Sequence, residues 1–452
     1  MSKSTLVVSC PIDTYSGYGA RARDFVQSII DLDKYDVKIL SQRWGGTRFG
    51  YLEDHNDTSL SSRIIPQLTQ QPDIWIQITV PNEFQKVGKY NIGLTAGIET
   101  TLCDPSWIEG CNRMDLVMVS AQHAKDTFER SKFNMQDNNT KQITGVIELT
   151  TKVEVLFEGA DVNKYIPLAL PVQLDLSDID EKFCFLTVGH WLPGVLGEDR
   201  KNIGYTIKAF LETFKNKKDK PGLILKIQAG AGTSIMDREA VLDKIDEIRK
   251  TVKGTLPNIY LLHGDISDAE MNELYNHTKV KAMISLTKGE GFGRPLLEFS
   301  LVNKPIIASG WSGHIDFLDN QFTKQIGGTL NNVHPSAAVD KMILQESQWF
   351  TPDEALTGKA LKDVFEDYKP YKELANRQGY KSRTEFSYEK MKEKLDNLLT
   401  QYVPEFPKQV QLKLPQLKKI ELPKLNKIEL PQLKKLELPQ LKKLELPKLN
   451  KV

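Results

Sequence analysis

"VKAMISLTKGEGFGRPLLE" (residues 280–298) combines an apolar run, a glycine-rich loop and a helix start within nineteen residues. The apolar run 280–287 is nearly continuous, which is typical of a strand covered on both faces of a parallel sheet. The loop "KGEGFG" (288–293) follows at the carboxyl end of that strand. Pro295 is then favoured in the first turn of a helix. The stretch therefore predicts the strand–loop–helix unit of an α/β protein.

Two carboxylates flank this loop. Glu290 lies within it, and Glu298 lies about one turn into the predicted helix. Gly291 and Gly293 allow main-chain N–H groups to approach a ligand beside a helix N-terminus, where anions are favoured. Carboxylates accept hydrogen bonds from hydroxyls, so the two kinds of group together fit a nucleotide-sugar. Alternatively, Glu298 only complements the helix dipole and Glu290 is a solvated loop residue.

Short strand-like runs alternate with helix-period segments over most of the chain. A stretch rich in proline and acidic residues, 157–183, separates two such series and is interpreted as a hinge. The repetition predicts a doubly wound α/β fold with two Rossmann-like lobes that face a cleft. The predicted strands are residues 5–10, 36–40, 73–78, 91–95, 115–120, 183–189, 223–229, 258–264, 280–287 and 304–309. The predicted helices include residues 121–133, 201–216, 237–253 and 267–278, with a last helical region at about 352–402.

Composition predicts a soluble protein of a reducing compartment. No apolar run of the 452 residues approaches the roughly 18–20 residues that span a bilayer. The N-terminal sequence "MSKSTLVVSCPID" contains no signal-peptide pattern. The four cysteines are too few and too scattered for a disulfide framework, and their spacing does not match a zinc site. We therefore expect a cytoplasmic protein.

The C-terminal segment differs from the rest of the chain. Residues 403–452 contain twelve Lys and five Glu, for a charge of +7, so the remainder carries −6. An octapeptide repeat begins at Leu414, with prolines at 415, 423, 431, 439 and 447 that exclude a long helix. The segment is interpreted either as an extended tail or as a Lys- and Leu-bearing contact for a protein partner or an anionic membrane surface. The net negative charge of residues 1–402 does not favour a dedicated nucleic-acid binder, although it does not exclude a local basic groove.

The segment "EGFGRPLLEFSLVNKPIIASGWSGHIDFL" (290–318) resembles the E-x7-E region of the family 4 (group 1) retaining glycosyltransferases, which have the GT-B fold. "TVGHWLPGVLGEDRKNIGYTIKAF" (187–210) is similar to the start of their second domain. "SGYGARARDFVQSI" (16–29) resembles their first glycine turn, and "VLFEGADVNKYIPL" (155–168) resembles their interdomain signature. The resemblance covers about residues 5–400 and excludes the tail.

The resemblance implies a domain organisation. Residues 1–165 would form an N-terminal, acceptor-side domain, and residues 166–380 a C-terminal, nucleotide-sugar-binding domain. A terminal helix at 381–402 would pack back toward the N-terminal domain. Residues 403–452 would form the repeat tail.

The resemblance also implies roles for single residues. Arg200 and Lys201 stand where the family clamps the donor diphosphate. Family members often have an Arg at the position of His190, where it helps to bind the donor diphosphate. In this chain Arg200 or Arg294 would supply that arginine contact. The implied donor-binding residues are Gly17, Gly19, Arg200, Lys201, Gly291, Phe292, Gly293, Arg294, Pro295, Leu296 and Glu298.

Two acidic residues are candidates for the catalytic centre, Glu290 at the donor sugar and Glu99 at the acceptor. Glu99 would orient an acceptor hydroxyl, or it would only cap the following turn. No general base is assigned.

The implied reaction is transfer of a hexose from a UDP- or GDP-sugar to a hydroxyl, with retention of configuration and without a bound metal or other cofactor. The acceptor stays open among a glycan, a lipid-linked glycan, a protein and a hydroxylated base of modified nucleic acid. A peripheral membrane location through the tail is a further expectation, and no oligomeric state is predicted. The alternative of another class is an inactive GT-B scaffold that is recruited through its repeat tail.

Overall fold

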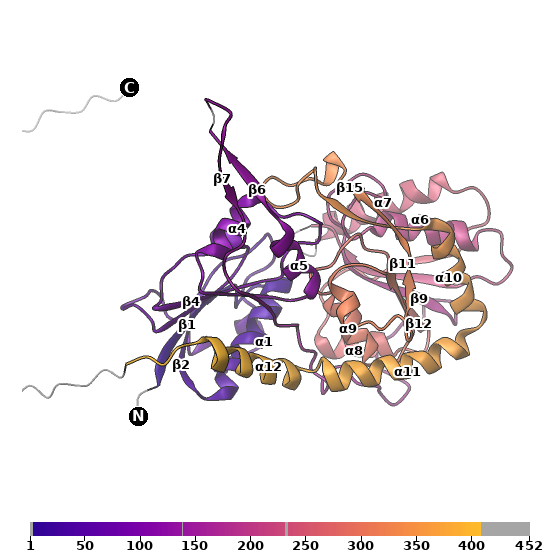
Figure 1. Cartoon of the computed structure of the whole chain (residues 1–452). Coiled ribbons are helices and arrows are strands. Elements are labelled where there is room, and N and C mark those ends of the chain that lie inside the picture. The colour runs from indigo at the N-terminus through magenta and orange to yellow at the C-terminus, as the bar shows by residue number, and fades with distance from the viewer. Residues whose placement is uncertain (1–2, 138, 231–233, 408–452) are drawn as a thin grey trace, which may run out of the picture. The chain divides into compact units, whose positions relative to one another are not determined.

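The computed structural model describes residues 3–137, 139–230 and 234–407. Chain contacts divide the protein into a compact unit, Met1–Phe406, and a second unit, Pro407–Val452. The octapeptide repeat, which begins at Leu414, lies outside the described residues, so both interpretations of it stay predictions. Within the first unit, two lobes each contain a six-stranded sheet (Figure 1).

The N-terminal lobe is built on a sheet of order β2-β1-β3-β4-β5-β8. All its strand pairs are parallel, with Leu6 of β1 beside Val37 on one side and Ile74 on the other. A separate antiparallel hairpin, β6–β7, projects from this lobe (Figure 1). The elements are β1 (Ser4–Cys10), α1 (Gly17–Leu32), β2 (Tyr35–Ser41), α2 (Tyr51–Asp54), α3 (Thr58–Ser61), β3 (Ile74–Ile78), β4 (Tyr90–Thr95), α4 (Pro105–Asn112), β5 (Leu116–Val119), α5 (Gln122–Arg130), β6 (Phe133–Gln136), β7 (Ile143–Ile147) and β8 (Val153–Val155).

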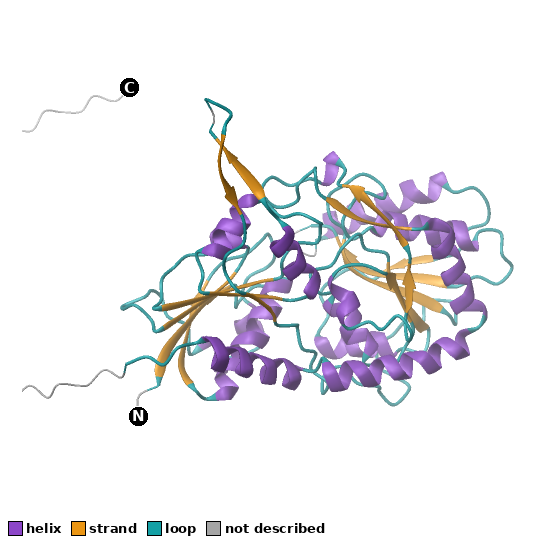
Figure 2. Ribbon diagram, viewed as in Figure 1, coloured by secondary structure: helices purple, strands orange, loops and turns teal. Residues whose placement is uncertain are grey.

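The C-terminal lobe repeats this plan with the parallel order β11-β10-β9-β12-β13-β14. Its helices flank the strands (Figure 2), and an antiparallel hairpin, β15–β16, lies beside the main sheet. The elements are β9 (Cys184–His190), α6 (Ile203–Phe214), β10 (Gly222–Gln228), α7 (Ile235–Thr251), β11 (Ile259–Leu261), α8 (Asp268–Asn276), β12 (Val280–Ser285), α9 (Arg294–Ser300), β13 (Ile306–Ser309), β14 (Lys324–Ile326), β15 (Gly328–Asn332), β16 (Gln348–Pro352), α10 (Glu354–Glu366), α11 (Tyr368–Glu385) and α12 (Tyr388–Tyr402).

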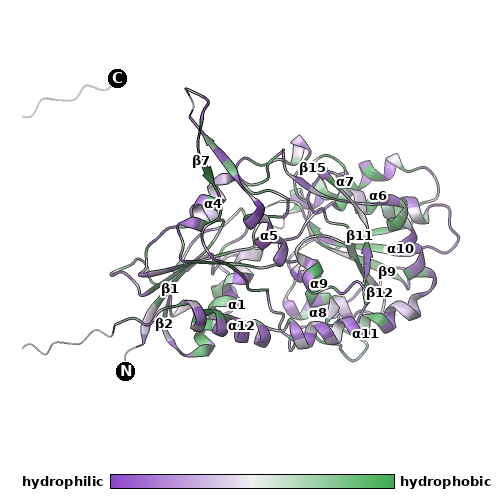
Figure 3. Cartoon of the chain, viewed as in Figure 1, coloured by the Kyte–Doolittle hydropathy of each residue, from purple (hydrophilic) through white to green (hydrophobic). Residues whose placement is uncertain are grey.

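All ten strands predicted from apolar runs are present, and the predicted α/β class is confirmed. The runs are apolar because both faces of each sheet are covered, as the fully buried pattern of β3 illustrates. Hydrophobic residues are frequent in the strands, and hydrophobic and hydrophilic residues alternate along the helices (Figure 3). In α1 and α6, the buried positions include Phe25, Ile29, Ile207 and Phe210. Strands β6, β7, β8, β14, β15 and β16 are not predicted from the sequence. They are short, and β6, β7 and β15 are mostly exposed, so they lack a continuous apolar run.

Helix α12 returns from the C-terminal lobe to pack on α1. Tyr388 donates a hydrogen bond from its hydroxyl to Asp31 at 3.1 Å, and Lys34 forms an ion pair with Asp396. The chain just before α12 is also bonded to the segment after β8, because Ala160 N–H donates to the Phe386 carbonyl at 3.0 Å. One hydrophobic cluster consequently runs through both lobes.

Arg21 of α1 holds this junction from inside. Its guanidinium donates to the carbonyls of Leu156 at 2.6 Å and Phe157 at 2.9 Å, and the residue is 5% exposed. Replacing Arg21 by Met leaves both carbonyls without donors, so we expect a loss of about 3 kcal/mol in the free energy of unfolding. Urea denaturation followed by circular dichroism measures it. The matched variant Arg130→Met, at an exposed side chain of α5, should change stability by less than about 0.5 kcal/mol.

Candidate functional site

The glycine loop (residues 289–293) lies between β12 and α9, at the carboxyl end of the central strands of the C-terminal lobe. All five residues are buried. Glu290 N–H donates to the Ser312 hydroxyl at 2.8 Å, and its carbonyl accepts from Gly313 N–H at 2.9 Å. The loop is therefore held in place by the segment after β13.

Glu290 forms the centre of an ion-pair cluster. Lys201, from the loop between β9 and α6, donates from Nζ to both carboxylate oxygens, at 2.7 and 2.6 Å. Arg200 Nη1 lies 3.7 Å from Glu290 Oε2. Burial by itself would raise the pKa of Glu290, but the charges of Lys201 and Arg200 outweigh it and lower the pKa below its ordinary value. Glu290 is thus an ionised, buried carboxylate.

Arg200 connects this cluster to the N-terminal lobe. Its Nη1 lies 3.0 Å from Glu99 Oε1 and donates to the Gly289 carbonyl at 2.9 Å. Close by, Thr101 N–H donates to the Gln348 carbonyl at 2.8 Å. The two predicted catalytic candidates, Glu99 and Glu290, therefore both lie within 4 Å of the same guanidinium nitrogen, Arg200 Nη1.

The loop glycines allow the two lobes to meet. A Cβ on Gly289 would lie 2.3 Å from the Glu99 carbonyl oxygen, and one on Gly291 would lie 3.0 Å from the Ala96 oxygen. Gly293 has φ +93°, which L side chains rarely adopt. The glycines are therefore required by close backbone approach and by backbone conformation.

The second carboxylate, Glu298, belongs to a separate network. Arg294 donates from Nε to Glu298 Oε1 at 2.9 Å and from Nη1 to Asp24 Oδ2, on α1, at 2.5 Å. Burial raises the pKa of Glu298 to about 7, although Arg294 acts in the opposite direction. Arg294 thus bridges the lobes, and Glu298 is poised between its two protonation states near neutral pH.

The glycine loop presents free donors. Among the described residues, none accepts a hydrogen bond from the backbone N–H groups of Gly291, Phe292 or Gly293. Buried N–H groups nearly always have a partner. Three adjacent unpaired donors next to Lys201 and Arg200 are suited to an anionic or oxygen-rich ligand.

A cavity of about 350 Å³ opens beside Lys201, at the carboxyl ends of β9 and β10. Lys226 is one of its lining residues, and its Nζ donates to the Gly264 carbonyl at 2.5 Å. His190, which replaces the family Arg, is engaged through Nε2 with the Ala229 carbonyl at 2.8 Å. The residues that line the cavity are Val188, Gly189, His190, Lys201, Lys226, Ile227, Gln228, Asp265, Ile266 and Met271. In open α/β sheets, this is the edge at which ligands bind.

Other predicted site residues have different surroundings. Phe292 and Leu296 are each 3% exposed and belong to the hydrophobic core, so only their backbone atoms are candidates for ligand contact. Gly19 is pressed against the turn before α1, where a Cβ would lie 2.1 Å from the Thr14 oxygen. A Cβ on Gly17 would meet nothing within 4 Å. Pro295 occupies the first turn of α9.

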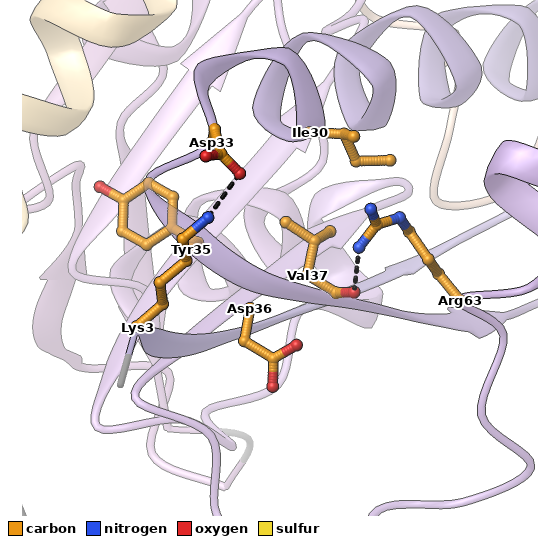
Figure 4. Close-up of a pocket in the computed structure, with 7 residues that line it drawn as sticks. All are labelled: Lys3, Ile30, Asp33, Tyr35, Asp36, Val37 and Arg63. Carbon is orange, nitrogen blue, oxygen red and sulfur yellow. Dashed lines mark hydrogen bonds and ion pairs between the residues drawn. The ribbon is translucent and has the colours of Figure 1, made fainter. Parts of the chain in front are cut away.

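A second cavity, of about 390 Å³, lies at the amino ends of β1 and β2 (Figure 4). Its charges are largely satisfied locally, because Lys3 pairs with Asp33 at 2.5 Å and Arg63 donates to the Val37 carbonyl at 3.4 Å. This cavity lies at the amino ends of strands in the N-terminal lobe, whereas the glycine loop follows the carboxyl end of β12 in the C-terminal lobe. It is therefore not a candidate for the same site.

Sequence reasoning misses several residues of the site. Asp24 is 270 positions from its partner Arg294, and no local pattern marks the pair. Ser312 receives the Glu290 N–H, and Lys226 lines the cavity from within a strand. Lys226 does have a local signal, because a charged residue within the otherwise largely apolar run 223–229 indicates a functional position near the end of a strand.

The sequence matches no protein-family model and no curated protein. Among solved structures, a glycosyltransferase from Rickettsia africae matches with a TM-score of 0.59 at 12% identity, covering 89% of this chain and 99% of that one. Sucrose-phosphate synthase from Thermosynechococcus elongatus matches with a TM-score of 0.56 at 11% identity, covering 88% and 99%.

A third solved structure, Anabaena HepE in complex with UDP and glucose, matches with a TM-score of 0.52 at 11% identity, covering 88% of this chain and 100% of that one. All three matches extend over both lobes. The chain therefore has the GT-B fold, as expected from its sequence, with two parallel α/β lobes arranged as in these solved proteins.

Proposed function

We propose that the chain is a glycosyltransferase that moves a hexose from a nucleoside-diphosphate sugar to an acceptor hydroxyl with retention of configuration. The observation that carries the proposal is the pairing of Arg200 and Lys201 with the glycine loop, whose N–H groups of residues 291–293 are unpaired. Cations and backbone donors bind a diphosphate, and the carboxylates of Glu290 and Glu298 accept hydrogen bonds from hydroxyls. The cavity beside Lys201 has room for a nucleoside.

In the proposed reaction, the bond between the sugar C1 and the diphosphate oxygen breaks. The acceptor oxygen forms its bond to C1 on the same face, and its proton passes to the departing diphosphate. Lys201 and Arg200 stabilise the negative charge that develops on the leaving group, which is the task that a metal ion performs in other transferases. Glu290 positions the hexose hydroxyls, and Glu298 positions the ribose hydroxyls. Arg294 orients Glu298 through their hydrogen bond.

The solved proteins support a uridine donor. HepE structures contain UDP, UDP with glucose, or UDP-glucose. These ligands belong to HepE, and we extend them to this chain as the first donors to test. Glu99, which faces Arg200 from the N-terminal lobe, is the proposed contact for the acceptor hydroxyl.

A donor panel tests the proposal. The protein is incubated with UDP-glucose, UDP-galactose, UDP-N-acetylglucosamine and GDP-mannose, and released UDP or GDP is measured over time. We expect one donor to be turned over, slowly by hydrolysis and faster with acceptor. Absence of both turnover and nucleotide binding with every donor would contradict the proposal.

Donor binding is expected to depend on pH through Glu298. Above its pKa of about 7 the carboxylate is ionised and accepts ribose hydrogen bonds strongly, whereas below it the protonated acid accepts them weakly. Affinity for UDP should therefore fall as the pH is lowered from 8 to 6. Isothermal titration calorimetry measures this change, and in Glu298→Gln the same pH step should lower the affinity less, by only the part that comes from protonation of the terminal phosphate of UDP. An equal pH dependence in both proteins would exclude Glu298 as its source.

A further inference from the structure

Lys288 is a buried lysine immediately before the glycine loop. The residue is 2% exposed, and its Nζ donates to the Thr351 hydroxyl of β16 at 3.2 Å. The same Nζ lies 3.7 Å from Glu198 Oε2 and 5.7 Å from the ring centre of Trp349. A lysine is almost never this buried unless it is paired. These contacts bind Lys288 to two segments that are distant in sequence.

The backbone of Lys288 joins the same segments. Its N–H donates to the Arg200 carbonyl at 2.8 Å, and its carbonyl accepts from Phe350 N–H of β16 at 3.0 Å. Arg200 belongs to the clamp loop (residues 191–202), which connects β9 to α6. Lys288 therefore lies where the clamp loop, the glycine loop and β16 meet.

Charge explains why a lysine suits this position. Glu198 and the buried Asp199 are the acidic residues of the clamp loop near Lys288. Burial raises the pKa of Asp199 to about 6, and Lys288 acts against that rise. An apolar residue of similar size would fill the space at lower desolvation cost but would remove the cation that faces these two acids. The side chain thus holds the acidic part of the clamp loop in place.

We infer that Lys288 is a positioning residue, which fixes the Arg200–Lys201 pair relative to the N–H groups of the glycine loop. This inference rests on the proposed function, because it assumes that this pair binds the donor diphosphate. Lys288 acts through the clamp loop and β16, without touching the ligand itself. Residues that orient metal ligands from outside the metal site contribute about ten- to a hundredfold to affinity or activity, and we expect an effect at the lower end of that range here.

The test is the affinity for UDP and GDP, measured by titration calorimetry on the full-length chain. Lys288→Met removes the charge and keeps most of the volume, and we expect the Kd to rise about tenfold with unchanged stoichiometry. Thr351→Val removes one contact without changing the shape, and we expect a rise of about threefold. Glu198→Gln combined with Lys288→Met should add little to the effect of Lys288→Met, because both changes break the same contact.

Stoichiometry separates positioning from a general loss of structure. If Lys288 only supported folding, Lys288→Met would lower the number of binding sites and leave the Kd of the remaining sites unchanged. That result, or a wild-type Kd in both Lys288→Met and Thr351→Val, would overturn the inference. The matched control Lys359→Met, an exposed lysine of α10 paired with Asp363, should bind as wild type. If the wild-type chain binds neither UDP nor GDP, the proposed function is contradicted, and this inference, which depends on it, is contradicted too.

Discussion

Glu290→Gln is expected to lower donor turnover by about 100-fold, equivalent to about 2.7 kcal/mol of transition-state stabilisation. Gln keeps the size of the side chain but removes the charge that both Lys201 and Arg200 face. Lys201 is then free to rotate away from the glycine loop, and the hexose loses a charged acceptor. The measurement is the initial rate of UDP release from the donor that the wild-type chain turns over.

The control for this variant is Glu212→Gln on α6. Glu212 also pairs with a lysine, Lys215, but at a partly exposed position on the helix surface. Exposed pairs contribute about 0–1 kcal/mol, so its turnover and melting temperature should match those of the wild type. If Glu290→Gln and Glu212→Gln both turned over the donor at the wild-type rate, Glu290 would have no role in the reaction.

Gly313→Ala is expected to destabilise the protein by about 3 kcal/mol or more and to displace the glycine loop. A Cβ at this position would lie 2.1 Å from the Gly291 oxygen and 2.7 Å from the Glu290 oxygen. Both contacts are with backbone, which cannot rotate away as a side chain can. The lower stability should appear as a lower midpoint urea concentration, with an unchanged dependence of the unfolding free energy on urea concentration.

The matched control is Gly358→Ala in α10. Its Cβ would be 3.4 Å from the Thr213 hydroxyl, which is ordinary contact, and the residue lies inside a helix. Alanine favours the helix over glycine by about 0.5–1 kcal/mol, so this variant should equal or exceed wild-type stability. If Gly313→Ala were as stable as Gly358→Ala, the close approach of Gly313 to the backbone of the glycine loop would be contradicted.

The fold is predictable from the sequence because buried parallel strands have an unambiguous pattern. Runs such as residues 183–189 and 223–229 are mostly apolar, with Thr187, Lys226 and Gln228 as exceptions, and each corresponds to a strand of the second sheet. Hairpin β15–β16 shows the opposite case. The sequence "GTLNN" of β15 is exposed along its whole length, so no apolar pattern distinguishes it from a loop. Its pairing with β16 depends on the tertiary arrangement.

The candidate site is only partly predictable. Local spacing places Glu290 and Glu298 around a glycine turn, and the family resemblance selects Arg200 and Lys201. The ion pair between Lys201 and Glu290 joins residues 89 positions apart, and local patterns do not record such distances. Lys288 follows the end of a strand, where a solvated lysine is ordinary. Its burial results from the packing of β16 over it, which is a long-range feature.

The two chain crossings between the lobes limit how the protein can move. The segment after β8 and the start of α12 cross side by side, joined by the hydrogen bonds of Ala160 with Phe386 at 3.0 Å and Tyr388 at 2.8 Å. Because the two crossings are adjacent, we expect a hinge rotation about them to be the lobe motion that disturbs these bonds least. The ion pair of Glu99 with Arg200 and that of Asp24 with Arg294 must then open together. Separation of the lobes by such a rotation would also have to break the hydrogen bonds between Thr101 and Gln348, which join the lobes on the same side as Glu99 and Arg200.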